Sequence, residues 1–228
     1  MDKTKKAFKL ERPVKSANSP SEIQTLTLQQ ALDLGLQHHT AGDLVKAESI
    51  YQQILQTDPN CPEALHLLGV IFHQAGKSDR AVDLIKKALS HKPDFTEAHS
   101  NLGVSLEKLG KLDEAVAHYQ SAVAINPDYA EAHSNLGVAL QKSGQLEEAI
   151  NSCRKALTIN PEFAGAHYNL GNALNELERL DEAVASYQKA IDIKSDFTEA
   201  HSNLGTVLKE LGRPDEAITH YHKALAIE

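Results

Sequence analysis

The sequence predicts an all-α protein, built as a right-handed solenoid of six stacked helix pairs. The first observation is a period: the run EAHSNLG at Glu97–Gly103 returns 34 residues later at Glu131–Gly137, and two periods further on at Glu199–Gly205. The second is the spacing of apolar residues, which recur at steps of three and four in two runs per period, as in amphipathic helices. A fixed period of this length indicates identical supersecondary units that stack on one another.

Residues Thr96–Tyr129 show the helix pair that each period is expected to form. The first apolar run starts at Ala98 and the second ends at Ile125, with Gly110 between them. Gly110 suits the left-handed residue that ends a helix, and Pro127 disfavours a helical residue before it. One such pair has too little core to stand alone, so it must bury its faces on its neighbours.

Taken in order, the chain is expected to divide into a tail, residues 1–26, and a solenoid domain, residues 27–228. The tail carries six basic and three acidic residues, a net charge of about +3, and has almost no periodic apolar signal, so we expect it to be flexible. An arm attracted to nucleic acid or to an anionic membrane is the functional alternative. The domain starts with a capping-box pattern, Thr27 and Gln30. The expected repeats are residues 28–61, 62–95, 96–129, 130–163, 164–197 and 198–228, the last incomplete.

Charge and composition limit the classes of partner that the protein can have. The formal net charge is -8, and with about +3 on the tail the repeats carry about -11, which disfavours nucleic acid as their partner. No run approaches the roughly eighteen apolar residues of a membrane helix, so no membrane insertion is expected. The N-terminus lacks the apolar region of a signal peptide, and a cytoplasmic location is therefore expected.

The units resemble the tetratricopeptide repeat family over most of the chain. The glycine of the first helix is found at Gly35, Gly69, Gly103, Gly137, Gly171 and Gly205. The small residue of the second helix is found at Ala47, Ala81, Ala115, Ala149, Ala183 and Ala217, and the closing proline at Pro59, Pro93, Pro127 and Pro161. The departures are local: Glu178 replaces the glycine between the helices, Ser195 the proline, and Cys153 an aromatic residue. In this family the first helix of each repeat lines a concave groove, so the resemblance implies a groove here.

An asparagine recurs at the groove-facing sixth position of the first helix. The row is Asn101, Asn135, Asn169 and Asn203. It is similar to the asparagine ladder in the superhelical arm of the O-linked N-acetylglucosamine transferases, and the resemblance implies that these amides grip the backbone of an extended polypeptide. An amide suits the task because it offers both a donor and an acceptor to a peptide group. The structural alternative is that each asparagine bonds a neighbouring helix and recurs because the unit was duplicated.

Other expected groove positions are also polar. They are Tyr168, Asn172, Gln141 and Lys209, together with Asn175 and Thr206. The second position of the first helix is a glutamate in four repeats, Glu63, Glu97, Glu131 and Glu199. These acids would repel a terminal carboxylate, which argues against the chaperone-tail clamps of the same family.

The sequence predicts no enzyme, no cofactor and no metal site. It contains no GxSxG elbow, no phosphate-binding GxxxxGK[ST] loop and no GxGxxG motif. Paired acids such as Asp113 and Glu114 are expected at helix starts, where the helix dipole favours them. His99, His133, His167 and His201 recur one repeat apart, roughly 10 Å in packed helices, whereas zinc nitrogens lie about 2 Å from their metal. We expect these histidines to pack between the helices of a repeat.

The predicted function is a protein–protein interaction scaffold that binds an extended segment of another protein in its concave groove. The alternative is the substrate-recruiting arm of a larger glycosyltransferase with a catalytic domain beyond residue 228, because the repeats resemble the arms of bacterial relatives of the O-linked N-acetylglucosamine transferases. A third possibility is self-association, because the final helix keeps an internal-repeat pattern at Ala217, Ile218, Tyr221 and Leu225. Solenoids require a polar outer face on their terminal unit, and this pattern lacks one.

Overall fold

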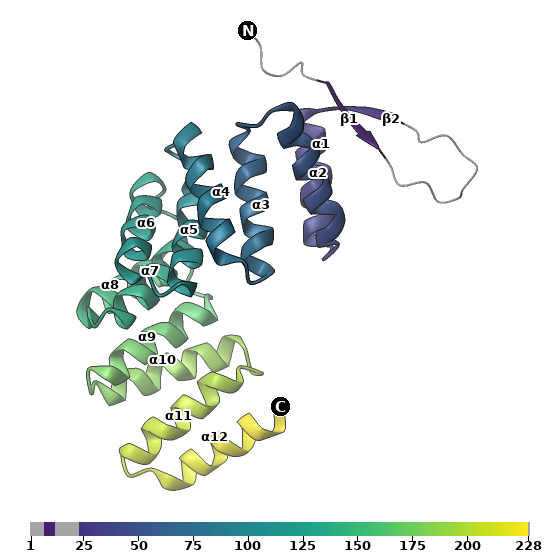
Figure 1. The fold of residues 1–228 in the computed structure, drawn as a ribbon. Coiled ribbons are helices and arrows are strands. Elements are labelled where there is room, and N and C mark those ends of the chain that lie inside the picture. The colour runs from purple at the N-terminus through teal and green to yellow at the C-terminus, as the bar shows by residue number, and fades with distance from the viewer. Residues whose placement is uncertain (1–6, 12–22, 228) are drawn as a thin grey trace. The chain divides into compact units, whose positions relative to one another are not determined.

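The computed structural model describes residues 7–11 and 23–227 of the chain (Figure 1). Within these residues it contains twelve α-helices and two short β-strands. The helices are α1 (Leu28–Thr40), α2 (Leu44–Thr57), α3 (Pro62–Gln74), α4 (Ser78–His91), α5 (Thr96–Lys108), α6 (Leu112–Ile125), α7 (Ala130–Lys142), α8 (Leu146–Ile159), α9 (Ala164–Glu176), α10 (Leu180–Ile193), α11 (Thr198–Glu210) and α12 (Pro214–Ile227). The predicted all-α class, with helices packed as consecutive hairpins, is confirmed.

The chain forms two compact units, of which the first ends at Leu109 and the second starts at Gly110. In the first unit α1 packs on α2, α2 on α3, α3 on α4, and α4 on α5. Its core includes the fully buried Tyr51 and Ile54 together with Leu68 and Phe72. The predicted capping box is present at the start of α1. The backbone N–H of Gln30 donates to Thr27 Oγ1 (3.2 Å), and the backbone N–H of Thr27 donates to Gln30 Oε1 (2.9 Å).

Two strands precede the helices, where the sequence predicted a flexible tail. Strand β1 (Ala7–Glu11) pairs antiparallel with β2 (Ile23–Thr27), with Ala7 opposite Thr27 and Glu11 opposite Ile23. Both strands contact α1, and β1 also contacts α2. Nine residues of the predicted tail, 7–11 and 23–26, thus lie in paired strands, each too short to show a clear apolar period in the sequence. Flexibility of the tail as a whole stays a prediction. The rest of the predicted tail, residues 1–6 and 12–22, lies outside the described residues.

The second unit repeats one packing motif three times, in the hairpins α7–α8, α9–α10 and α11–α12. Helix α6 packs on α7, α8 on α9, and α10 on α11, so each hairpin covers the next. The small residues predicted at the helix crossings are buried: Ala149, Ala183 and Ala217 on the second helices and Gly137, Gly171 and Gly205 on the first. The family pattern of small residues thus marks the places where helices approach most closely.

The turn inside each helix pair has a left-handed residue, as predicted. Gly42, Gly76, Gly110, Gly144 and Gly212 have φ between 72° and 78°. The fifth repeat has Glu178 at the same position with φ 57°, so its turn keeps the shape of the others without a glycine. Since a left-handed conformation costs a residue with a Cβ about 1–2 kcal/mol, the departure at Glu178 is a local strain and not a change of fold.

The predicted final helix is present as α12, which packs on α11. Ala217 and Ala224 are buried, whereas Ile218 and Leu225 are 52% and 68% exposed. None of the helices among the described residues is both long enough and apolar enough to cross a membrane.

Candidate functional site

The asparagine row lies on the first helices, and its side chains hydrogen-bond the preceding repeat. In the first unit Asn101 Nδ2 lies 2.8 Å from His66 Nε2. In the second unit Asn169 Nδ2 donates to Ser134 Oγ at 3.0 Å. Each of these two partners stands 35 residues before its asparagine. The donor end of the amide therefore ties one first helix to the next.

Asn203, the last of the row, makes two such bonds. Its Nδ2 donates to the Tyr168 hydroxyl at 3.1 Å and to Asn172 Oδ1 at 3.0 Å. The side chains of Asn169 and Asn203 are half-buried, and among the described residues no hydrogen bond is found to the Oδ1 atom of either. The donor ends thus make the bonds to a neighbouring helix that the structural alternative predicted, whereas a role of the acceptor ends in peptide binding stays a prediction.

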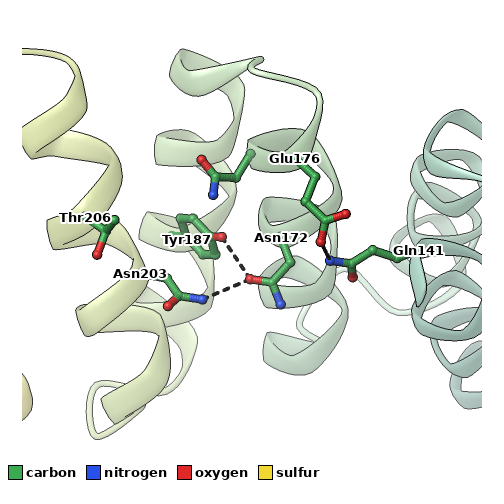
Figure 2. Close-up of a pocket in the computed structure, with 7 residues that line it drawn as sticks. Gln141, Asn172, Glu176, Tyr187, Asn203 and Thr206 are labelled. Atoms are coloured by element: carbon green, nitrogen blue, oxygen red, sulfur yellow. Dashed lines mark hydrogen bonds between the residues drawn. The ribbon is translucent and has the colours of Figure 1, made fainter. Parts of the chain in front are cut away.

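A polar pocket of about 280 Å³ lies beside this row in the second unit (Figure 2). Its walls come from α7, α9, α10 and α11. The lining residues are Gln141, Asn172, Asn175, Glu176, Tyr187, Asn203 and Thr206. Of the groove positions expected from the sequence, five line the pocket: Gln141, Asn172, Asn175, Asn203 and Thr206.

The other predicted site residues lie outside the pocket lining. Tyr168 adjoins it through its bond from Asn203, and Asn169 is the neighbouring residue on α9. Asn135 is half-buried on α7 and Lys209 is exposed on α11, while Asn101 belongs to the first unit. The sequence therefore predicted a row of asparagines. In the structure only Asn203, at the C-terminal end of that row, lines the pocket.

Hydrogen bonds inside the protein orient the pocket side chains. Asn172 Oδ1 accepts from the Tyr187 hydroxyl at 2.8 Å and from Asn203 Nδ2 at 3.0 Å, as Figure 2 shows. Gln141 Nε2 donates to Glu176 Oε1. The Tyr187 side chain is 1% exposed, and burial raises the pKa of its hydroxyl, which stays a neutral donor. Polar groups held in place before a ligand arrives lose less entropy on binding.

Sequence reasoning missed Glu176 and Tyr187 as lining residues. No consistent signal pointed to Tyr187: a polar residue stands 15 positions before Tyr187 and before Tyr221, but the apolar Val104 stands 15 positions before Tyr119. Asn172 accepts from Tyr187 in this way, and Thr206 Oγ1 accepts from the Tyr221 hydroxyl at 3.3 Å.

Family comparisons match almost the whole described helical region. A model described as TPR repeat matches residues 105–144 and 171–212. Three models described as Tetratricopeptide repeat match residues 130–163 and 198–228, residues 38–103, and residues 152–185. The chain belongs to the tetratricopeptide repeat family. A search of curated proteins finds no match.

Solved structures of tetratricopeptide repeat type are similar to this chain. The crystal structure of MamA is 29% identical, covers 70% of this chain and 94% of its own, and has a TM-score of 0.64. YrrB, described as a TPR protein with an unusual peptide-binding site, is 26% identical over 75% of this chain and 88% of its own, with a TM-score of 0.62. PilW, a type IV pilus biogenesis factor, is 23% identical over 87% and 92%, with a TM-score of 0.80, and shows the fold alone.

The recurrent histidines of the tetratricopeptide repeats have a structural contact in common. The Nε2 atoms of His99, His133 and His167 lie 2.9–3.0 Å from the carbonyl oxygens of Pro93, Pro127 and Pro161, and His201 Nε2 lies 3.2 Å from the oxygen of Ser195. A carbonyl oxygen only accepts, so each Nε2 carries the proton. The histidines thus fasten the first helix of one repeat to the turn that ends the previous one.

The described part of the chain contains neither a candidate metal-binding cluster nor a reactive cysteine. No group of three or more histidine, cysteine, aspartate or glutamate side chains there could hold a metal ion. Cys61 and Cys153 are free and buried, and burial raises the pKa of the Cys153 thiol to about 12. A thiol in that state is a packing group and not a nucleophile at neutral pH.

Proposed function

We propose that this tetratricopeptide repeat protein is an interaction scaffold that binds an extended segment of another protein along the first helices α7, α9 and α11. The observation that carries the proposal is the pair of half-buried amides Asn169 and Asn203, whose donor ends are bound inside the protein and whose acceptor ends have no hydrogen bond among the described residues. A row of such acceptors can receive peptide N–H groups whatever the side chains of the bound segment.

Two further observations support this proposal. The polar pocket adjoins Asn203, so a chain lying along the row would pass its mouth. YrrB, a structural neighbour, is a TPR protein with an unusual peptide-binding site. We therefore place the ligand on the first-helix face and not on the outer second helices.

The other functions considered from the sequence stay predictions. The family models match repeats, which a scaffold and the recruiting arm of a glycosyltransferase would share. Self-association through Ile218 and Leu225 of α12 would use a different surface from the amide row. The experiment below separates that surface from the row, because a ligand held by α12 would not respond to changes on α9 and α11.

Removing two amides of the row is expected to weaken peptide binding. The probe is a fluorescein-labelled peptide selected on the wild-type chain from a phage-displayed library of short random sequences. In the Asn169→Ala/Asn203→Ala variant its affinity should fall about tenfold, because two hydrogen bonds of about 0.5–1.5 kcal/mol each are lost. Fluorescence anisotropy measures the affinity, and circular dichroism checks that the helices remain.

Asn151→Ala is the matched control. Asn151 is also an asparagine, but it lies exposed on the second helix α8. The control should bind the peptide as the wild type does. Selection of no peptide at all, equal affinity in the double variant, or an equal loss in the control would each contradict the proposal.

A further inference from the structure

We infer that the pocket between α7, α9, α10 and α11 is a subsite for a cationic side chain, lysine or arginine, of the bound segment. The inference rests on the proposed function and adds a preference to binding that is otherwise tolerant of sequence. Three properties of the pocket support this inference: its negative charge, a buried acceptor without a partner among the described residues, and a size that suits one side chain.

The charge is negative. Glu176 is the one charged residue among those that line the pocket. Gln141 Nε2 donates to Glu176 Oε1, which holds the carboxylate at the wall, as Figure 2 shows. No lysine or arginine among the described residues forms an ion pair with Glu176. The charge is therefore left for a ligand to neutralise, although its exposure to solvent moderates the effect.

The pocket contains a buried hydrogen-bond acceptor without a partner in the described part of the chain. Asn175 Oδ1 is buried and has no hydrogen-bond partner among the described residues. Asn203 Nδ2 uses both of its N–H groups inside the protein, so its carbonyl oxygen is the end that it can still offer. Gln141 Nε2 uses one N–H group, so Gln141 offers its carbonyl oxygen and its second N–H. The Tyr187 and Thr206 hydroxyls donate to Asn172 Oδ1 and to the Ser202 carbonyl. A buried acceptor without a donor is unfavourable, so a donor-rich group is stabilised here.

Lysine and arginine have the matching chemistry. An ammonium group brings three donors and no acceptor, and a guanidinium brings five donors and no acceptor. An aspartate or glutamate of the ligand would be repelled by the negative charge of Glu176, and its carboxylate would offer no donor to Asn175 Oδ1. The pocket therefore discriminates by the sign of the charge.

The size and position suit one side chain of a longer ligand. At about 280 Å³ the pocket is at the lower limit of the roughly 300–1,000 Å³ that is usual for pockets of small molecules. Three of its four walls are first helices, which also carry the amide row. A segment bound along the row would thus deliver a side chain into the pocket while its backbone meets Asn169 and Asn203.

The test is a comparison of peptides selected from the same random library on the full chain and on its Glu176→Gln, Glu176→Lys and Glu148→Gln variants. Peptides selected on the wild type should be enriched in lysine or arginine at one aligned position. The enrichment should disappear with Glu176→Gln, which keeps an oxygen to accept from Gln141, and should turn to aspartate or glutamate with Glu176→Lys. Glu148 is exposed on α8, so Glu148→Gln should leave the enrichment unchanged.

A binding measurement gives the size of the effect. Replacing the enriched residue of a selected peptide by alanine should weaken binding to the wild type by about threefold to tenfold, since hydrogen bonds to charged groups are stronger than neutral ones. The same replacement should change binding to Glu176→Gln by less than about twofold, because the charged part of that hydrogen bond is gone. As a free probe, N-acetylargininamide should bind far more weakly than the peptide.

The outcomes separate this inference from the proposed function. If peptides are selected but show no basic position, or if the basic position persists with Glu176→Gln, the cationic subsite is wrong while the scaffold proposal stands. If N-acetylargininamide binds as tightly as the selected peptide, the pocket takes a free small cation and the inference is wrong. If no peptide is selected on any variant, the proposed function itself fails.

Discussion

Gly137→Ala is expected to destabilise the second unit by about 1–3 kcal/mol, the usual cost of overpacking a well-packed core. A Cβ atom on Gly137 would lie 2.5 Å from Cys153 Sγ and 3.2 Å from the carbonyl oxygen of Ala149. Both neighbours belong to α8, and the Cys153 side chain is fully buried, so it has no free space to enter. Urea unfolding followed by circular dichroism measures the loss of free energy of unfolding.

A second substitution tests the cause. Cys153→Ala removes the sulfur atom that the new methyl group would meet, although alone it leaves a small cavity. In the double variant Gly137→Ala/Cys153→Ala the free energy of unfolding should therefore decrease by less than the sum of the two single decreases, because the two residues are in contact. If the two losses simply add, the clash is not what makes glycine necessary at position 137.

Acidification is expected to destabilise the first unit through His66. This side chain is 5% exposed, and its ring packs on Phe95 with the centroids 4.7 Å apart. Asn101 Nδ2, which only donates, lies 2.8 Å from His66 Nε2, so that nitrogen accepts and the imidazole is neutral. Burial is the main cause that lowers the pKa of His66 to about 4. The charge of Lys92 contributes in the same direction, and that of Glu63 opposes it.

The sign of the pH dependence follows from this lowered pKa. An unfolded histidine has a pKa of about 6.5, so the unfolded chain binds the proton first as the pH falls. The stabilisation is fully present above about pH 6.5 and is lost as the pH falls toward about 4. Between about pH 7 and about pH 5 the free energy of unfolding should decrease by about 2 kcal/mol on account of His66.

His66→Ser is the matched variant, because other repeats have serine at this position and Ser134 accepts from Asn169 there. The variant is expected to be less stable than the wild type at neutral pH, since it loses the contact with Phe95. Its free energy of unfolding should nevertheless depend less on pH over this interval. Equal pH dependence in the two proteins would mean that His66 is not the titrating group.

Local signals in the sequence predicted most of the helical architecture. Gly110 marked the left-handed end of a helix, and Thr27 with Gln30 marked the start of α1; the structure confirms both. Such signals succeed because a cap or a turn depends on residues that are close in sequence. Strands β1 and β2 escaped prediction because their pairing joins segments that are separated in sequence, each only five residues long.

The candidate site was predictable as a row but not as a pocket. The sixth-position asparagines follow from the repeat period, so their common face could be read from the sequence. The bond from Asn203 to Tyr168 depends on the distance between two first helices, which no spacing along the chain gives. Tyr187 belongs to a second helix, and its hydroxyl donates to Asn172 Oδ1 in the pocket, a contact that depends on how the two helices pack.

The central claim is that the first-helix face of the second unit binds an extended polypeptide. Nuclear magnetic resonance of the ¹⁵N-labelled chain, titrated with the selected peptide, tests it most directly through the side-chain amide signals. We predict that the signals of Asn169, Asn172 and Asn203 move on binding while that of Asn151 on α8 does not. Movement of the Asn151 signal with the three first-helix signals unchanged would place the ligand on the outer surface and contradict the account.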